Sequence, residues 1–294
     1  MTCPTVTVLT PAYNCAGFLG QTMRSVLGQC YPNLEYIVLD DGSTDDTQEI
    51  LSRFRNIPVV TLLSHSNMGE HRTINKGLQM VAGKYFMIVN ADDPLLPFAI
   101  PRLVEFMEGH PSVLCAYPDI KTINEDGSLH AYVKRPEYNF KFMVRHHYCL
   151  PSVGAIFRSD VIRSVGYRDP QFRWTSDFDY WLRIGLAGDM CHVPETLATW
   201  RHSNGQLSAD RSNDRAAERE RLVTKFYSLD VPPEIHAVKA EAFSWAYLVA
   251  AQISSDWHDR AGYIRRALTT YPRQLFGLEF WDALRKYATW RLTR

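Results

Sequence analysis

The 294-residue sequence has no excess of charge of either sign, no cysteine framework and no long apolar run. Lysine plus arginine and aspartate plus glutamate each number 32, so no overall positive field would collect nucleic acid, and we expect no such partner. The six cysteines lie far apart without a C-x-x-C pair, which favours reduced thiols. No stretch reaches the roughly 18 apolar residues of a membrane span, and the N-terminus shows no secretory pattern. The expected location is the cytoplasm.

Two phosphate-binding signatures are also missing. No G-x-G-x-x-G follows the first strand-like segment, and no G-x-x-x-x-G-K-[ST] occurs anywhere in the chain. These absences argue against a nucleotidyltransferase and against a dinucleotide oxidoreductase on a similar sheet. With 46% hydrophobic and 22% charged residues, the chain can still bury a sizeable core.

Short apolar, β-branched runs alternate with helical patterns along the first ninety residues. The runs are typical of buried parallel strands and lie at 5–9, 34–39, 59–63 and 85–89. Apolar residues with a 3.6-residue period fall between them, at 18–27, 50–54 and 74–81. This alternation predicts an α/β fold in which crossover helices connect the strands of a parallel sheet.

The pattern becomes mixed after Asp93 and purely helical after about residue 212. Helices are expected at 98–107, 159–166 and 178–186, and extended segments at 113–117 and 196–200. Further helices are expected at 215–227, 237–254 and 259–269. We therefore predict one domain over residues 1–211, with halves at 1–93 and 94–211, and a helical C-terminal region over residues 212–294.

Polar clusters follow four of the predicted strands. They are 10–14, 40–43, 67–69 and 90–93. Each cluster alone is explained by a turn or a helix cap, but ligands of open parallel sheets bind beyond the carboxyl ends of the strands. Two carboxylate pairs at one edge also raise each other's pKa, unless a cation or hydrogen-bond donors stabilise their negative charge. The four clusters together therefore predict a ligand site at this edge.

The order of these motifs resembles that of the inverting family 2 glycosyltransferases, which have the GT-A fold. The resemblance covers most of residues 5–208, and its segments are Val8–Asn14, Ser25–Gln29, Tyr31–Glu35, Asp40–Asp45, Asn75–Gly77, Ala82–Gly83, Asn90–Asp93 and Ser176–Arg183. It implies a Rossmann-like, mixed and mostly parallel sheet flanked by helices. Residues 1–93 would be the nucleotide-sugar-binding half and residues 94–211 the acceptor-side half of the catalytic domain.

The resemblance also implies a reaction. A sugar would pass, with inversion, from a nucleotide-diphosphate sugar to a hydroxyl of a carbohydrate or lipid-linked sugar acceptor, in surface polysaccharide or glycolipid biosynthesis. The expected donor is a UDP-sugar, because Tyr13 would offer its ring to the base and Asp41 would accept the imide N–H. The residues implied in donor binding are Thr10, Pro11, Tyr13, Asp41, Asn75, Lys76, Asn90, Ala91 and Asp92. For Lys76, a solvated lysine on a helix is an equally good explanation.

A divalent cation, Mn²⁺ or Mg²⁺, is the implied cofactor. Asn90 stands where the family usually has an acid, and a neutral amide brings no charge, so we place the metal on Asp93, with Asp92 towards the ribose or the metal. His202 is either a further metal ligand or an ordinary loop residue. Gly154 would let the backbone approach the donor or the acceptor closely.

Asp177 is the implied general base, which takes the proton of the attacking hydroxyl. The alternative for Asp177 is a helix N-terminal acid stabilised by the dipole, with Asp179 as the replacement base. Asn90 also leaves open a catalytically inactive nucleotide-sugar-binding or scaffold protein. A basic, amphipathic helix at 278–292 either packs on its own domain or contacts the inner face of the cytoplasmic membrane.

Overall fold

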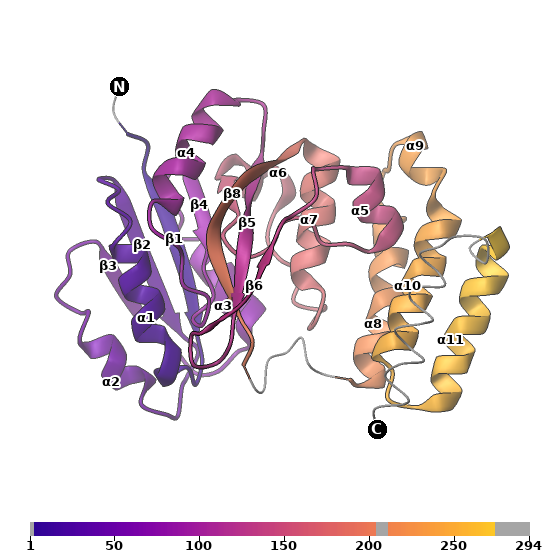
Figure 1. The fold of residues 1–294 in the computed structure, drawn as a ribbon, viewed down its shortest axis with the longest axis horizontal. Coiled ribbons are helices and arrows are strands. Elements are labelled where there is room, and N and C mark those ends of the chain that lie inside the picture. The colour runs from indigo at the N-terminus through magenta and orange to yellow at the C-terminus, as the bar shows by residue number, and fades with distance from the viewer. Residues whose placement is uncertain (1–2, 204–210, 274–294) are drawn as a thin grey trace. The chain divides into compact units, whose positions relative to one another are not determined.

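The computed structural model describes residues 3–203 and 211–273 (Figure 1). The first half of the chain forms β1 (Val6–Ala12), α1 (Ala16–Leu27), β2 (Leu34–Asp40), α2 (Thr47–Ser52), β3 (Val60–Ser64), α3 (Glu70–Leu78), β4 (Tyr85–Ile88), α4 (Ala99–Gly109) and β5 (Cys115–Ile123). It continues with β6 (Leu129–Val133), α5 (Phe140–His146), β7 (Ile156–Arg158), α6 (Asp160–Val165), α7 (Ser176–Ala187) and β8 (Met190–Arg201). The last described elements are α8 (Asn213–Phe226), α9 (Pro233–His236), α10 (Lys239–Ile253) and α11 (Trp257–Thr270).

The eight strands form one mixed sheet. Its order is β3-β2-β1-β4-β7-β5-β6, and β8 pairs with β5. The four N-terminal strands β1 to β4 are parallel, as is the pair of β5 with β8, whereas β7 runs antiparallel to both β4 and β5. The expected mixed and mostly parallel sheet flanked by helices is confirmed, and so are helices in the C-terminal region.

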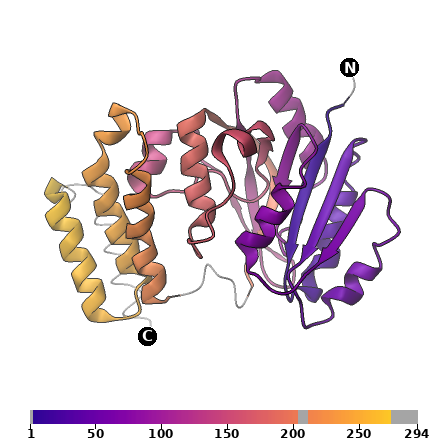
Figure 2. The same ribbon diagram turned by 180° about the vertical axis from the view of Figure 1, so that it is seen from behind.

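Alternation along β1 assigns the helices to opposite faces of the sheet. Val6 and Val8 join the core that α1 and α4 cover, as Figure 1 shows. Leu9 points to the other face, where α3 packs on it and on Leu39 of β2 (Figure 2). Because side chains of a strand alternate between the two faces, a continuous apolar run is what a doubly covered strand requires.

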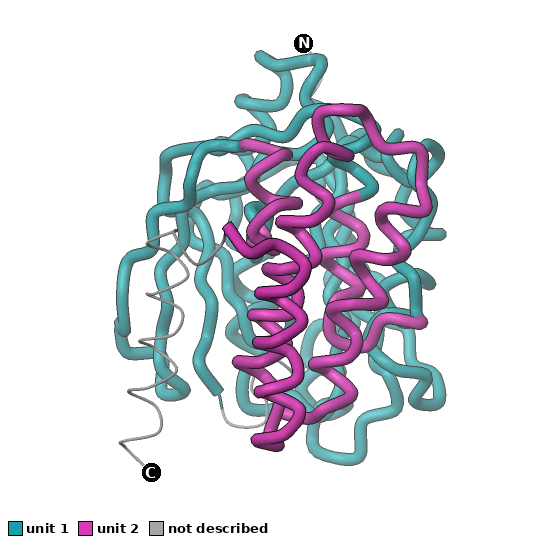
Figure 3. Tube along the Cα trace, turned by 90° about the vertical axis from the view of Figure 1, so that its right-hand side faces the viewer, with its two compact units in different colours: residues 1–138, 150–170, 183–204 teal, residues 139–149, 171–182, 205–294 magenta. Residues whose placement is uncertain are grey.

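The chain divides into two compact units (Figure 3). Unit 1 comprises 1–138, 150–170 and 183–204, and unit 2 comprises 139–149, 171–182 and 205–294. Helix α7 starts in unit 2 and ends in unit 1. Unit 2 thus groups two segments from the middle of the chain with the C-terminal helices, and the domain boundary at residue 211 stays a prediction.

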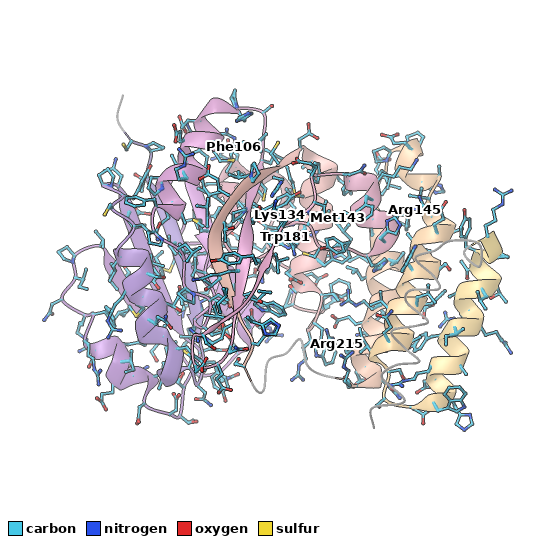
Figure 4. All side chains as sticks on the ribbon, in the orientation of Figure 1. Phe106, Lys134, Met143, Arg145, Trp181 and Arg215 are labelled. Atoms are coloured by element: carbon cyan, nitrogen blue, oxygen red, sulfur yellow. The ribbon has the colours of Figure 1, made fainter. Side chains whose placement is uncertain are left out.

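Unit 2 is a helical body with its own core. Met143 of α5 is fully buried, and Arg145, two residues further along, forms an ion pair with Glu241 of α10 (Figure 4). The rings of Phe140 and Phe226 meet edge to face with 6.2 Å between their centroids. Aromatic pairs of this kind stabilise beyond the area that they bury. Helix α5 is therefore held to α8 and α10 by both apolar and ionic contacts.

The backbone of Gly154 closely approaches strand β8. Its φ is +80°, and a Cβ atom there would lie 2.4 Å from the Cβ of Ala198 and 3.2 Å from Pro118. Only glycine fits such a position without displacing a strand. The observed approach is thus to the sheet, and an approach to donor or acceptor stays a prediction.

None of the helices in residues 3–203 and 211–273 combines the length and the apolar character needed to cross a bilayer. The basic helix predicted at 278–292 lies outside the described residues.

Candidate functional site

The carboxyl ends of β1, β2 and β4 meet at one edge of the sheet. Leu9 of β1 is paired with both Ile37 of β2 and Ile88 of β4, so the segments that follow these strands leave the sheet together. Thr10 is buried within β1, and its hydroxyl lies 3.0 Å from that of Tyr36, so a backbone contact of Thr10 with the donor stays a prediction. Tyr13, by contrast, is 50% exposed. Its ring can therefore serve as a stacking surface at the edge.

The two neighbouring aspartates of the second cluster have different roles. Asp40 caps its own turn: it accepts hydrogen bonds from the Ser43 N–H at 3.2 Å, from the Ser64 hydroxyl at 3.0 Å and from the Gln48 amide. Asp41 is also buried, but it reaches across to another loop. Its two oxygens accept the N–H groups of Met68 at 2.7 Å and Gly69 at 2.9 Å. Asp41 therefore joins the loops after β2 and β3.

Gly42 allows these two loops to touch. Its φ is +72°, and a Cβ atom would lie 2.6 Å from the backbone nitrogen of Asn67 and 3.1 Å from the carbonyl oxygen of His65. Any side chain would push the loop away. On the other side, the Asn14 backbone N–H donates to the Ser43 hydroxyl at 2.9 Å. Three of the predicted polar clusters are thus connected directly.

Asn75 contacts protein main chain. Its amide donates to the carbonyl oxygen of Arg168 at 2.7 Å and accepts the N–H of the same residue at 3.0 Å. This reciprocal pair fixes the loop after α6 against α3. Lys76, the next residue, is half-buried on α3. A donor contact of either residue stays a prediction, and for Asn75 both hydrogen-bonding ends of the side chain already have partners.

Asp93 faces the protein interior. It is 3% exposed, and its oxygens accept the Arg201 N–H at 2.9 Å and the Asn90 amide at 3.0 Å. Burial first, and then the charge of Asp92, raise the pKa of Asp93 to about 8, against the opposing effect of these hydrogen bonds. Asp92 is half-buried, and Ala91 between it and Asn90 is buried. The more accessible carboxylate of the pair is therefore Asp92.

Arg201 is the residue of this site that the sequence analysis missed. Its buried guanidinium donates to the carbonyl oxygen of Asp92 at 3.0 Å, to that of Glu125 at 2.9 Å and to the side chain of Gln21 at 2.7 Å. It also lies 4.8 Å above the ring of Phe18. An arginine at the end of a strand, beside His202, was the available signal. Arg201 ties α1, the Asn90–Asp93 segment and the β5–β6 turn together.

A raised pKa makes stability depend on pH with a defined sign. Asp93 has an ordinary pKa of 3.8 and a folded pKa of about 8, so its favourable contribution is present at acid pH and is lost as pH rises through about 8. We expect the free energy of unfolding of the wild type to fall, relative to that of Asp93→Asn, between about pH 4 and pH 8. Urea denaturation without divalent cations measures this, and a constant difference across that range would contradict it.

His202, the second predicted metal ligand, follows the end of β8. Its backbone N–H donates to the Ile123 carbonyl oxygen at 2.8 Å. Its imidazole ring packs against the rings of Trp200 and His130, whose centroids are 4.6 Å and 4.8 Å away. Within the described ranges, no group of three or more His, Cys, Asp or Glu side chains is arranged to hold a metal. A metal contact of His202 therefore stays a prediction.

Asp177 belongs to unit 2 and lies at the start of α7. It is half-buried and accepts the N–H of Phe178 at 2.7 Å. Asp179, the replacement candidate, is 3% exposed and forms an ion pair of 2.7 Å with Lys225. A buried, paired carboxylate is a poor acceptor for the proton of an incoming hydroxyl. The geometry therefore favours Asp177 over Asp179.

The arrangement in unit 1, a parallel-sheet edge with an exposed aromatic ring and buried carboxylates, suits a nucleotide ligand. The model of the family described as glycosyl transferase family 2 matches residues 7–165. The chain belongs to this family. The matched range spans β1 to α6 and includes every predicted donor-binding residue from Thr10 to Asp92, so the family 2 resemblance of the motifs is confirmed.

The chain is similar to three known glycosyltransferases or their structures, as follows. A UDP-Glc:α-D-GlcNAc-diphosphoundecaprenol β-1,3-glucosyltransferase of Escherichia coli, WfaP, is 25% identical over 209 residues, which are 70% of this chain and 80% of the relative. The structure of S. aureus TarS with UDP-GlcNAc aligns over 92% of this chain and 91% of its own, with a TM-score of 0.64 and 16% identity. The mannosyltransferase PcManGT of Pyrobaculum calidifontis, in complex with GDP-Man and Mn²⁺, aligns over 98% and 81%, with a TM-score of 0.66 and 19% identity. The two structures show a shared fold.

Proposed function

We propose that this family 2 glycosyltransferase moves a sugar, with inversion, from a UDP-sugar to an acceptor hydroxyl. The observation that carries the proposal is the joined set of loops at the sheet edge, where Tyr13 after β1 is exposed and Asp41 after the neighbouring β2 is buried. Stacking on the ring and acceptance of an imide N–H suit uracil. The binding of UDP-GlcNAc by TarS and the UDP-Glc donor in the name of WfaP support this choice.

The proposed step forms one bond and breaks one. The acceptor oxygen attacks the anomeric carbon, the bond from that carbon to the donor phosphate breaks, and the electron pair leaves with the nucleoside diphosphate. Asp177 takes the proton of the acceptor hydroxyl, a contribution of about 10²- to 10⁴-fold. Attack opposite to the leaving group inverts the configuration, and no covalent intermediate with the protein is needed.

We propose a revised assignment for the metal contact. Asp92 is the more accessible carboxylate of the pair, so it is better placed than Asp93 to hold a Mn²⁺ or Mg²⁺ ion, and the bond of Asp93 to Arg201 fixes the adjoining backbone. The cation, when bound, offsets the negative charge that builds on the leaving diphosphate. The Mn²⁺ in the PcManGT complex supports the use of a divalent ion. His202 remains a candidate for a further ligand.

The acceptor in this proposal is a hydroxyl of a carbohydrate or of a lipid-linked sugar. The GlcNAc-diphosphoundecaprenol in the name of WfaP supports the lipid-linked type. The reaction would then belong to the assembly of a surface polysaccharide or glycolipid, at the cytoplasmic face of the membrane.

Calorimetric titration of the full chain with UDP, in Mn²⁺ and then in EDTA, tests the donor site. We expect Mn²⁺ to tighten UDP binding at least about tenfold, which corresponds to about 1.4 kcal/mol. Asp92→Asn should abolish this gain, whereas Asp126→Asn, which changes an exposed carboxylate of the β5–β6 turn, should keep it. If none of UDP, GDP and dTDP binds with Mn²⁺, the transferase proposal is rejected.

A further inference from the structure

Glu218 of α8 is a fully buried carboxylate that accepts four hydrogen bonds from one short segment. Its Oε2 accepts the Arg173 N–H at 2.8 Å. Its Oε1 accepts the Trp174 N–H at 2.8 Å and both the N–H and the hydroxyl of Thr175, at 2.7 Å and 2.8 Å. Burying a carboxylate is costly unless donors of this kind surround it. The side chain is therefore committed to the three residues that precede α7.

The segment that Glu218 holds determines where α7 begins. The carbonyl oxygen of Thr175 accepts the Asp179 N–H at 2.8 Å, which is the first turn of the helix. Asp177 lies within this turn, two residues after Thr175, and its own oxygen is bonded to the Phe178 N–H. A shift of the 173–175 backbone would therefore move the proposed base directly.

A second contact from α8 supports the same first turn. Lys225, which is seven residues after Glu218 and so on the same side of α8, pairs with the buried Asp179. Arg219, the residue after Glu218, is also close enough to the proposed base to interact with its charge. Burial lowers the pKa of Arg219, while the negative charges of Asp177 and Glu218 raise it. Helix α8 thus presents Glu218, Arg219 and Lys225 to the start of α7.

We propose that Glu218 is a positioning residue for the general base, acting through the 173–175 backbone. The proposal rests on the role of Asp177 in the proposed function. It makes α8 part of the catalytic apparatus, although this helix lies beyond residue 211, where the predicted catalytic domain ends. If Glu218 were only structural, replacing it would lower the stability of unit 2 and leave the turnover per folded molecule unchanged.

The test compares Glu218→Gln with Glu220→Gln in the full chain. The amide introduced by Glu218→Gln keeps the size of the side chain but presents an N–H₂ group to one of the backbone donors. Glu220, two residues along α8, pairs instead with Arg266 and Tyr247. Thr175→Val removes a single hydroxyl contact and serves as a milder second variant in case the first folds poorly.

Turnover is measured as UDP release from UDP-glucose and UDP-GlcNAc with water as acceptor, and backbone amide exchange is followed in residues 171–180. We expect Glu218→Gln to lower kcat by about 10- to 100-fold with the donor KM within about twofold, since small misplacements of a reacting group have effects of this size. Exchange in 171–180 should quicken at least about tenfold, as expected for opened amides. Glu220→Gln should change neither quantity, and Thr175→Val should lie between the two.

Unchanged kcat in Glu218→Gln, with quickened exchange, would overturn the positioning role. Unchanged exchange would overturn the proposal whatever the activity. If the wild type releases no UDP from any donor, the proposed function fails, and the exchange measurement still decides whether Glu218 holds this segment. The two failures are therefore distinguishable.

Discussion

Replacing Asp177 with asparagine is expected to lower the rate of sugar transfer by about 10²- to 10⁴-fold, the usual contribution of a general base. The amide cannot take a proton, yet it has the size of the carboxylate and can still accept the Phe178 N–H. Binding of UDP should stay within about twofold of the wild type, because the predicted donor residues lie in the other compact unit. Steady-state kinetics with saturating donor, together with calorimetry of UDP, measure the two effects separately.

Asp160→Asn is the matched control for this variant. Asp160 is also an acid in the first turn of a helix, the six-residue α6, and is exposed there. If Asp177 acts only on the helix dipole, both variants should lose a few tenths of a kcal/mol of stability and neither should lose activity. Equal activity of the two variants would remove Asp177 from the mechanism.

Replacing Asp41 with asparagine should weaken UDP binding by about 10- to 100-fold, which is the loss of one charge-assisted hydrogen bond of about 1.5 to 3 kcal/mol. The amide would also meet the N–H groups of Met68 and Gly69 with a donor where the wild type has an acceptor. The variant therefore loosens the loop after β3 as well as the base site. Calorimetry with UDP measures the sum of both effects.

A comparison of UDP with CDP separates the base contact from the loop. Cytosine has an acceptor where uracil has an imide N–H, so the wild type should prefer UDP and Asp41→Asn should lose or reverse that preference. Asp46→Asn changes an exposed carboxylate at the start of α2 and should leave both affinities alone. An unaltered preference for UDP in Asp41→Asn would show that Asp41 serves the loop only.

Most elements of the fold were predictable, including short ones such as β4 and α6, whereas α5 and β7 were not. Strands β1, β2 and β4 are largely buried, as their apolar, β-branched runs predict, and helices such as α1 and α4 display three or more turns of a 3.6-residue period. Helix α5 has seven residues and strand β7 has three, which is too few to show a period. In β8 only 196–200 was expected, because Pro194 and Glu195 interrupt the pattern where the register with β5 shifts.

For the site, the sequence predicted which segments meet, because the carboxyl ends of parallel strands share one edge. It did not predict what each carboxylate contacts. Asp40 and Asp41 are adjacent and chemically identical, and only the fold makes the first a turn cap and the second a link to Met68 and Gly69. Likewise Asp93 is a plausible ligand by type, and its burial against Arg201 follows from a strand more than a hundred residues away.

That distance along the chain has a consequence for synthesis on the ribosome. Asp93 and its partner Arg201 are separated by 108 residues, and Arg201 is the last residue of β8. A nascent chain that has released β1 to β4 and the Asn90–Asp93 segment already carries every predicted donor-binding residue, but it lacks the guanidinium that joins Gln21, Asp92 and the β5–β6 turn. Domains fold as units during synthesis, once their last interacting segment becomes available. The growing polypeptide therefore completes the proposed donor site only after about two thirds of the chain has been made, when the strands of the predicted acceptor-side half exist as well.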